Sequence, residues 1–253
     1  MNTNQLSGQV AVITGSARGI GREIARTFAR AGARVVISDL QLADCERTAQ
    51  EIAAASANET AAIPWDVREA SGALDLARAT VERFGRLDVW VNNAGVRADD
   101  LLVRMKALAW DHVIDVNLKG AFSGTQAAAK VMLKARRGKI INIGSNAGTF
   151  GNAGQINYAA SKAGLAAITK TAARELASRN ITVNYIAAGF VRNDFASDLS
   201  PAALEWIENQ VPLKNPRDPS IDIALAARFL ASGDADWITG TILRVDGGLG
   251  IGF

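Results

Sequence analysis

The 253-residue sequence contains very few of the residues that build disulfides and histidine-rich metal sites, and it has no long apolar run. Cys45 is its only cysteine and His112 its only histidine, which argues against an internal disulfide, a histidine-rich metal site or a serine–histidine–aspartate triad. No apolar run is long enough to cross a bilayer, and the first residues lack the apolar core of a signal peptide. We therefore expect a soluble cytoplasmic protein with no metal and no membrane partner.

A strong charge imbalance is also lacking, since the formal net charge is +3. Basic residues are spread along the chain and mixed with acids, which argues against a nucleic-acid partner. The densest basic run, KARRGK at 134–139, is interpreted as the solvated end of a helix that stops at Gly138.

Apolar residues are abundant at 49%, enough for a large core, and an α/β chain of this length often forms one domain. Apolar, β-branched runs alternate with segments of helical period. This alternation predicts a doubly wound parallel sheet of about seven strands with helices on both faces, a single Rossmann domain over 1–253. The predicted strands are 10–14, 34–38, 61–65, 87–93, 139–145, 181–186 and 241–248.

The segment 190–215 departs from this alternation. Ser200 followed by Pro201 has the pattern of a helix N-cap with proline at the first helical position. An insertion beyond the carboxyl end of a strand is where an α/β fold usually places a substrate lid. We predict a lid at 190–215, with a helix packed for stability alone as the alternative.

The run TGSARGIG at 14–21 directly follows the first predicted strand and opens the first predicted helix. Its three glycines permit a tight turn and a close approach of the backbone to a pyrophosphate at the helix N-terminus. This strand–turn–helix context predicts a nucleotide site. Its expected cofactor contacts are Gly15, Ser16, Arg18, Gly19, Ile20 and Gly21.

Asp39 ends the second predicted strand and precedes Leu40, a further expected cofactor contact. At that place a carboxylate can accept hydrogen bonds from both ribose hydroxyls of an adenosine and repels a 2′-phosphate, which favours NAD over NADP. Arg18 has the opposite tendency, because a guanidinium beside the turn could pair with a phosphate. We expect NAD(H), with NADP(H) as the alternative.

Tyr158 and Lys162 are four residues apart on a predicted helix, so both side chains project from one face. Ser145 ends the predicted strand 139–145, at the edge of the sheet where sites of this fold lie. A nearby ammonium group favours phenolate and can lower the pKa of a tyrosine by roughly 1 to 3 units. The three residues therefore predict one reaction centre built around a tuned phenol.

These motifs together resemble those of the short-chain dehydrogenase/reductase family, over 5–248 of the sequence. Within that family, the runs LLVRMKALAW, GKIINIGSNAGTFGNAGQINYAASKAGL and ELASRNITVN most resemble the 3-oxoacyl-[acyl-carrier-protein] reductases. The motifs that carry the resemblance are TGSARGIG, Asp66 in WDV, NNAG at 92–95, Asn117 in VNLKG, Ser145 and YAASK.

The resemblance implies a role for each catalytic residue. Tyr158 would donate a proton to the carbonyl oxygen as hydride arrives from the nicotinamide, and Ser145 would hydrogen-bond that oxygen. Lys162 would hold the nicotinamide ribose and lower the pKa of Tyr158. Asn117 would support a water-mediated proton relay, or else serve as a structural amide inside a helix.

The resemblance also implies further contacts with cofactor and substrate. A carboxylate and a valine would lie at the adenine ring, and the NNAG segment would pass under the cofactor, with turn formation as the alternative for its asparagine and glycine. The further expected cofactor contacts are Asp66, Val67, Asn93, Ala94, Gly95, Gly189, Val191 and Asn193. The expected substrate contacts are Ser145, Asn146, Gln155 and Tyr158.

The sequence departs from the family pattern at three places. A Pro-Gly pair is usual where Ala188-Gly189 stands, and threonine is usual at Asn193, although asparagine still donates and accepts hydrogen bonds. Asp39 is the third departure, because the reductases that the sequence most resembles commonly prefer NADPH.

We therefore predict an NAD(P)-dependent carbonyl reductase or alcohol dehydrogenase, with 3-oxoacyl thioesters as the favoured substrates. Arg136 and Arg179 align with basic residues that such reductases use to dock acidic acyl carrier protein, though a free acyl-CoA or a small ketone is the alternative. The helices expected at 111–135 and 158–177 resemble those that join family members into tetramers, so we expect a homotetramer.

Three other functions remain open at this point. An NAD-dependent sugar, polyol or steroid dehydrogenase would suit Asp39. A nucleotide-sensing regulator that has lost its chemistry is disfavoured by the intact catalytic residues. An epimerase or dehydratase of the longer branch of the family is disfavoured by the glycine spacing and by the lack of an extra substrate domain.

Overall fold

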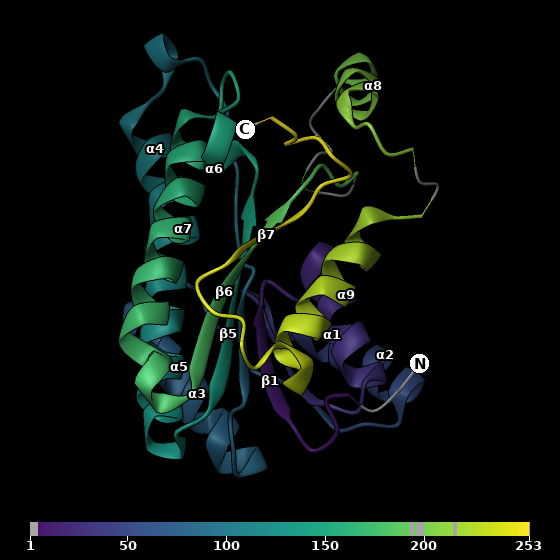
Figure 1. Ribbon diagram of the computed structural model, residues 1–253, viewed down its shortest axis with the longest axis vertical. Coiled ribbons are helices and arrows are strands. Elements are labelled where there is room, and N and C mark those ends of the chain that lie inside the picture. The colour runs from purple at the N-terminus through teal and green to yellow at the C-terminus, as the bar shows by residue number, and fades with distance from the viewer. Residues whose placement is uncertain (1–4, 193–194, 196–199, 215–216, 253) are drawn as a thin grey trace.

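The computed structural model describes residues 5–192, 195, 200–214 and 217–252. Its strands form one parallel sheet with the order β3-β2-β1-β4-β5-β6-β7, so the chain moves outward from β1 in one direction and then, from β4, in the other (Figure 1). This arrangement confirms the predicted α/β class and the seven strands. The strands are β1 (Val10–Thr14), β2 (Arg34–Ser38), β3 (Thr60–Ala62), β4 (Val89–Asn92), β5 (Gly138–Ser145), β6 (Ile181–Ala188) and β7 (Ile242–Val245).

Helices cover both faces of the sheet: α1, α2 and α9 lie on one face, and α3, α5 and α7 lie on the other (Figure 1). Within the described ranges, no helix is both long enough and apolar enough to span a membrane. The helices are α1 (Gly19–Arg30), α2 (Leu42–Ser56), α3 (Ala70–Phe84), α4 (Ala107–Ile114), α5 (Ala121–Ala135), α6 (Ala147–Phe150), α7 (Ile156–Leu176), α8 (Pro201–Gln210) and α9 (Pro219–Ala231).

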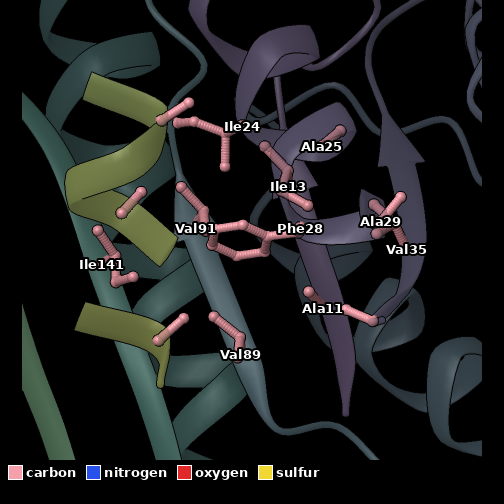
Figure 2. Packing of buried hydrophobic residues seen from close by; sticks show 14 of the residues in the cluster. Ala11, Ile13, Ile24, Ala25, Phe28, Ala29, Val35, Val89, Val91 and Ile141 are labelled. Carbon is pink, nitrogen blue, oxygen red and sulfur yellow. The ribbon is translucent and has the colours of Figure 1, made fainter. Parts of the chain in front are cut away.

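The two faces of the sheet bury two separate cores. Successive strand residues point to opposite faces, and in β1 both sets are apolar because helices cover both sides. Ala11 and Ile13 pack toward Phe28 of α1, in the cluster that Figure 2 shows. Val10 and Val12 face the other core, which holds the fully buried Trp90. A rigid double-sided sheet is thus available to hold a site at its edge.

Strand β3 differs from the prediction of 61–65, since it begins at Thr60 and ends at Ala62. The predicted end was wrong because Pro64 has no N–H to offer a neighbouring strand. Trp65 still donates its backbone N–H to the carbonyl oxygen of Asp39 at 3.0 Å, so the chain continues to follow β2.

The helix predicted to stop at Gly138 ends earlier. Helix α5 ends at Ala135, and Arg136 takes the left-handed conformation with φ 51°. Gly138 instead opens β5, where a Cβ would lie 2.3 Å from Sδ of Met132. This glycine is needed for the close packing of α5 on the sheet and does not cap the helix.

The helix predicted at 111–135 is interrupted by a π-helical segment, Asp115–Gly120, that joins α4 to α5. The helix predicted at 158–177 corresponds to α7. In the segment predicted as a lid, α8 begins as expected, because Oγ of Ser200 accepts the N–H of Ala203 at 3.2 Å and Pro201 is the first helical residue. Helix α8 stands apart from the sheet, on the side of α9 (Figure 1).

Candidate active site

The glycine turn between β1 and α1 has the geometry that its sequence predicts. Gly15 and Gly19 have φ of +62° and +57°, which side chains rarely tolerate. A Cβ at Gly21 would lie 2.3 Å from the carbonyl oxygen of Gly15 and 2.5 Å from Nδ2 of Asn93. The turn can therefore form only with glycine at these positions, and it leaves the N-terminus of α1 open to a phosphate.

Two residues of the same motif face inward. Ser16 is fully buried, and its hydroxyl donates to the carbonyl oxygen of Ile13 at 2.7 Å and accepts the N–H of Ser38 at 3.0 Å. Ile20 packs against the core on the α1 face. Both side chains point into the protein beneath the turn. Any contact of Ser16 or Ile20 with a cofactor would therefore involve their backbone groups.

The NNAG segment after β4 holds the glycine turn from the other side. Nδ2 of Asn93 donates to the carbonyl oxygens of Thr14 and Gly15, both at 2.9 Å. Oγ1 of Thr14 accepts the backbone N–H groups of Asn93 and Ala94 at 3.0 and 3.1 Å. A Cβ at Gly95 would lie 3.4 Å from Oδ1 of Asn117. The segment therefore links the turn to the helix that carries Asn117.

A cavity of about 700 Å³ opens beside the turn, where the adenosine end of a dinucleotide would lie. Asp39 lines it at the carboxyl end of β2, and its two oxygens accept the N–H groups of Ala17 at 3.1 Å and of Leu40 at 2.9 Å. These bonds fix the carboxylate toward the turn. The other charged residues of the lining are Arg18, Arg22, Glu23, Arg26, Asp44, Arg47 and Asp218.

Two of these arginines are paired with carboxylates of their own helices. Arg26 bonds to Glu23 at 3.2 Å, and Arg47 bonds to Asp44 at 2.7 Å. Arg18 is the exposed N-cap residue of α1, and Arg22 follows it by one helical turn. The four-residue spacing of Arg18 and Arg22 in the sequence could have indicated a second cation at this cavity.

Asp66 and Val67, the residues expected at an adenine ring, follow β3. The guanidinium of Arg68 bonds to both oxygens of Asp66 at 2.5 to 3.0 Å and holds the pKa of that carboxyl below its usual value. Val67 is buried against Gly120, where a Cβ would lie 2.8 Å from that of the valine. Asp66 is therefore ionised and already has a partner inside the chain.

The fold brings Ser145, Tyr158 and Lys162 together at the carboxyl end of β5. Ser145 is the last residue of the strand, while Tyr158 and Lys162 lie on α7. Nζ of Lys162 lies 5.6 Å from the ring centroid of Tyr158 and donates to the carbonyl oxygen of Ile143 at 3.0 Å. The reaction centre predicted from spacing is therefore assembled in three dimensions.

The pKa values at this centre differ from the prediction. Burial raises the pKa of Tyr158 to about 12, while a hydrogen bond with Ser145 and the charge of Arg97 act in the opposite direction. Burial also lowers the pKa of Lys162 to about 8. Desolvation therefore outweighs any lowering of the Tyr158 pKa by the ammonium group of Lys162.

Asn117 lies in the π-helical segment and is almost fully buried. Its Oδ1 accepts the N–H of Val96 at 2.8 Å, and its Nδ2 donates to the carbonyl oxygen of Val96 at 3.0 Å and to Oγ of Ser161 at 3.3 Å. The side chain thus makes the local contacts of the structural role that we named as its alternative, and the proton relay stays a prediction. Single π-helical turns of this kind are frequent at functional sites.

The amides expected to contact substrate bind carboxylates of the chain in this structure, and their contact with substrate stays a prediction. Asn146 donates through Nδ2 to Asp246, and Gln155 donates through Nε2 to Asp99 at 2.9 Å. Both residues lie beside the reaction centre, but their donors hold the surrounding loops.

The segment after β6 runs toward the cofactor cavity. Gly189 donates its N–H to the carbonyl oxygen of Val245 at 2.9 Å, and a Cβ there would lie 2.6 Å from Cα of Asp246. Val191 packs into the core and lines the cavity of Asp39. Asn193 lies outside the described residues.

Sequence reasoning missed the group formed by Arg97, Asp99 and Phe195. The ring of Phe195 lies 6.0 Å from that of Tyr158, and the guanidinium of Arg97 lies 5.4 Å from the centre of the Phe195 ring. Nε of Arg97 is 3.7 Å from Asp99. No motif or periodicity joins these residues, since they come from two loops that only the fold brings to Tyr158.

Arg136 and Arg179 lie close together but far from the reaction centre. Nη2 of Arg136 donates to the carbonyl oxygen of Ser178, at 3.4 Å. Each arginine lies two residues before a strand, β5 for Arg136 and β6 for Arg179, whereas Ser145 ends β5. At about 3.3 Å per strand residue, the length of β5 separates them from Ser145 by more than about 20 Å. Within one chain they cannot contact a group bound at Tyr158.

Comparison with known proteins identifies close relatives over nearly the whole chain. Residues 15–250 match the family model described as Enoyl-(Acyl carrier protein) reductase. The chain is 44% identical over 239 residues to the 3-oxoacyl-[acyl-carrier-protein] reductase of Staphylococcus epidermidis, which covers 94% of this chain and 98% of the relative. It is 41% identical over 245 residues to the enzyme of the same name from Thermotoga maritima, with 97% and 99% covered.

The structural comparison agrees with the sequence relatives. A solved structure described as a short-chain alcohol dehydrogenase from Sinorhizobium meliloti superposes with a TM-score of 0.90 and 34% identity, covering 98% of each chain.

Proposed function

This chain belongs to the short-chain dehydrogenase/reductase family, and we propose that it reduces 3-oxoacyl thioesters to 3-hydroxyacyl thioesters with a nicotinamide dinucleotide. It is an NAD(P)-dependent oxidoreductase that acts on ketone or secondary alcohol groups. The observation that carries the proposal is the assembly of Ser145, Tyr158 and Lys162 at the same sheet edge as the glycine turn. The names of its relatives supply the substrate class.

The residues of the turn fit a dinucleotide. The positions of Gly15 and Gly21 leave no room for a Cβ, so the backbone itself forms the surface that a pyrophosphate would meet. When bound, the dinucleotide supplies or accepts the hydride. Asp39 and the N-terminus of α1 would hold its adenosine and phosphates, and Lys162 its nicotinamide ribose.

The chain's own groups handle the proton. With a pKa of about 12, Tyr158 is protonated at neutral pH and can act as the acid that reduction requires. Ser145 is placed to donate a hydrogen bond to the same carbonyl oxygen and to stabilise the charge that develops there. Lys162, with a pKa of about 8, is mostly charged at pH 7 and would favour the phenolate that remains after proton transfer.

We propose NAD(H) as the preferred cofactor, on the basis of Asp39. Its carboxylate is fixed at the end of β2 by the N–H groups of Ala17 and Leu40, so it cannot turn away from a 2′-phosphate without losing both bonds. NADP(H) remains the alternative, supported by Arg18 and Arg22 in the same cavity.

For acyl carrier protein, we propose docking at Arg136 and Arg179 across a subunit boundary. The two arginines lie at the amino ends of β5 and β6, opposite to Ser145, so they are placed to orient an acyl carrier protein toward the site of a second chain. This proposal requires the homotetramer predicted from the sequence. A substrate lid at 190–215 of a single domain and a cytoplasmic location also remain predictions.

The docking proposal is tested with Arg136→Ala combined with Arg179→Ala. We expect kcat/KM to fall for a 3-oxoacyl-[acyl-carrier-protein] and to stay unchanged for the corresponding CoA thioester. Light scattering on the same samples must show tetramers. A monomer that still discriminates between the two carriers would contradict the proposal.

A sugar, polyol or steroid dehydrogenase is the second candidate, because Asp39 suits an enzyme that runs oxidatively with NAD. The two functions are separated by initial rates. We expect reduction of acetoacetyl-CoA with NADH to exceed, in kcat/KM, the oxidation of a panel of sugars, polyols and 3-hydroxysteroids with NAD. No reduction of the thioester, together with oxidation of a panel alcohol, would replace the proposal by the second candidate.

A further inference from the structure

Strand β5 has an edge that β4 leaves uncovered next to the reaction centre. The pairing of β4 with β5 ends at Asn92 and Asn142, three residues before Ser145. Alternate residues of a strand direct their N–H and C=O groups to opposite edges. Lys139 donates to the β4 side and Asn146 to the β6 side, so Ser145 directs its backbone groups to the side of β4.

A tyrosine side chain from β6 satisfies both backbone groups of Ser145. Tyr185 is 2% exposed, and its hydroxyl oxygen accepts the N–H of Ser145 at 2.8 Å. The hydroxyl proton is shared between the carbonyl oxygens of Ser145 at 3.1 Å and of Lys162 at 3.3 Å. One hydroxyl therefore joins the end of the catalytic strand to the catalytic turn of α7.

A glycine on β5 leaves room for the ring of this tyrosine to cross the strand. The ring of Tyr185 crosses Gly144, where a Cβ would lie 1.6 Å from Cζ of the ring. The ring is otherwise enclosed by a small apolar cluster that includes Leu165 of α7. The position of the hydroxyl is thus determined by close packing, with little freedom to move.

We propose that Tyr185 is a positioning residue, which with Gly144 fixes the backbones of Ser145 and Lys162 relative to each other. The inference rests on the proposed function only in that Ser145 and Lys162 serve the reaction. Nζ of Lys162 donates to the carbonyl oxygen of Ile143 at 3.0 Å, on the same uncovered edge of β5. Tyr185 itself touches neither substrate nor cofactor, because Ser145 and α7 cover it.

Catalysis is sensitive to this link because the reacting groups must be held within a fraction of an ångström. A displacement of about 1 Å can lower a rate by as much as about 100-fold. Burial raises the pKa of Tyr185 well above its usual range, so its hydroxyl keeps its proton and remains a donor across the working pH range.

The test replaces Tyr185 by phenylalanine, which keeps the ring and removes the hydroxyl. We expect kcat to fall about tenfold, while the KM for NADH changes less than about twofold, since Tyr185 does not border the cofactor cavity. In the oxidative direction the pH profile should move to higher pH, because a displaced Ser145 lowers the pKa of Tyr158 less. The amide of Ser145 should exchange its hydrogen faster.

Thr169→Val is the matched control. Thr169 is also a fully buried hydroxyl between α7 and β5, which accepts Nδ2 of Asn142 at 2.8 Å, two helical turns from Lys162. We expect this variant to lose stability but to keep kcat, the pH profile and the exchange rate of Ser145. Equal losses of kcat in the two variants, or an unchanged kcat in Tyr185→Phe, would overturn the proposal.

A second pair of variants separates packing from positioning. Gly144→Ala should displace the ring of Tyr185 and lower both stability and kcat. Adding Tyr185→Val relieves the clash, so we expect the melting temperature to recover while kcat stays low. Recovery of kcat along with stability would mean that Tyr185 only fills space.

The outcome does not depend on the natural substrate. If the proposed substrate class is wrong, the parent protein itself will fail to convert the thioester. This inference instead concerns the ratio of kcat in the variant to kcat in the parent, with any ketone or alcohol that the parent converts. The exchange of the Ser145 amide needs no substrate at all.

Discussion

The glycine turn and the catalytic end of α7 lie at the same edge of the sheet but are built in different ways. The turn is determined by the backbone, because Gly15 and Gly21 occupy places where any Cβ would collide. The catalytic group is held by side-chain hydrogen bonds to strand carbonyls, from Lys162 to Ile143 and from Tyr185 to Ser145. A backbone requirement leaves a signature in the sequence, whereas a side-chain brace between distant elements does not.

The first prediction disables the proposed reaction centre on α7 and leaves the glycine turn intact. Tyr158→Phe removes the proton donor, so we expect kcat to fall by about 10²- to 10⁴-fold. The affinity for NADH, measured by fluorescence titration, should change little, because the cofactor cavity is untouched. A variant that keeps more than a tenth of the parent kcat would exclude Tyr158 as the acid.

The second prediction disrupts the glycine turn and leaves the reaction centre intact. Gly21→Ala places a Cβ 2.3 Å from the carbonyl oxygen of Gly15, so we expect the turn to open and NADH affinity to fall at least about tenfold, with a loss of about 2 to 4 kcal/mol in unfolding free energy. Gly233→Ala is the control, since its Cβ would find no atom closer than 4.0 Å. Equal cofactor affinity in the two variants would contradict the steric argument.

The third prediction concerns the energetic cost of burying Lys162. Its folded-state pKa of about 8 is below the usual lysine value of 10.5, so the unfolded chain binds more protons between these values and stability rises with pH there. The parent should gain about 2 kcal/mol relative to Lys162→Met between pH 8 and 10. Denaturant titrations at both pH values measure this difference, and parallel pH dependences of the two proteins would contradict it.

The fourth and smallest effect sharpens the description of the adenosine cavity. Asp39→Ser removes the carboxylate that repels a 2′-phosphate, so we expect the ratio of kcat/KM for NADPH to that for NADH to rise about tenfold. Asp44→Asn is the control, because Asp44 lines the same cavity but is bonded to Arg47. If Asp44→Asn changed the ratio as much, general charge and not Asp39 would set the preference.

Prediction from the sequence succeeded where several residues together form a pattern that has one structural use. The alternation of apolar runs predicted the seven-stranded sheet, and the glycine spacing predicted the turn. It failed where one residue type has several uses. Gly138 was predicted to end a helix but makes room for Met132 on the sheet. The substrate contacts expected of Asn146 and Gln155 stay predictions, since the donors of both amides are bound to carboxylates of the chain.

The sequence by itself therefore determined the fold class and the glycine turn, and it singled out the side chains that we propose as catalytic. Only the tertiary structure decided how those side chains are tuned and held. Burial has the largest effect on the pKa of Tyr158, and Tyr185 of β6 reaches Ser145 of β5, which lies forty positions earlier in the sequence. Desolvation and cross-strand contact depend on which segments meet in space, and local sequence patterns do not contain that information.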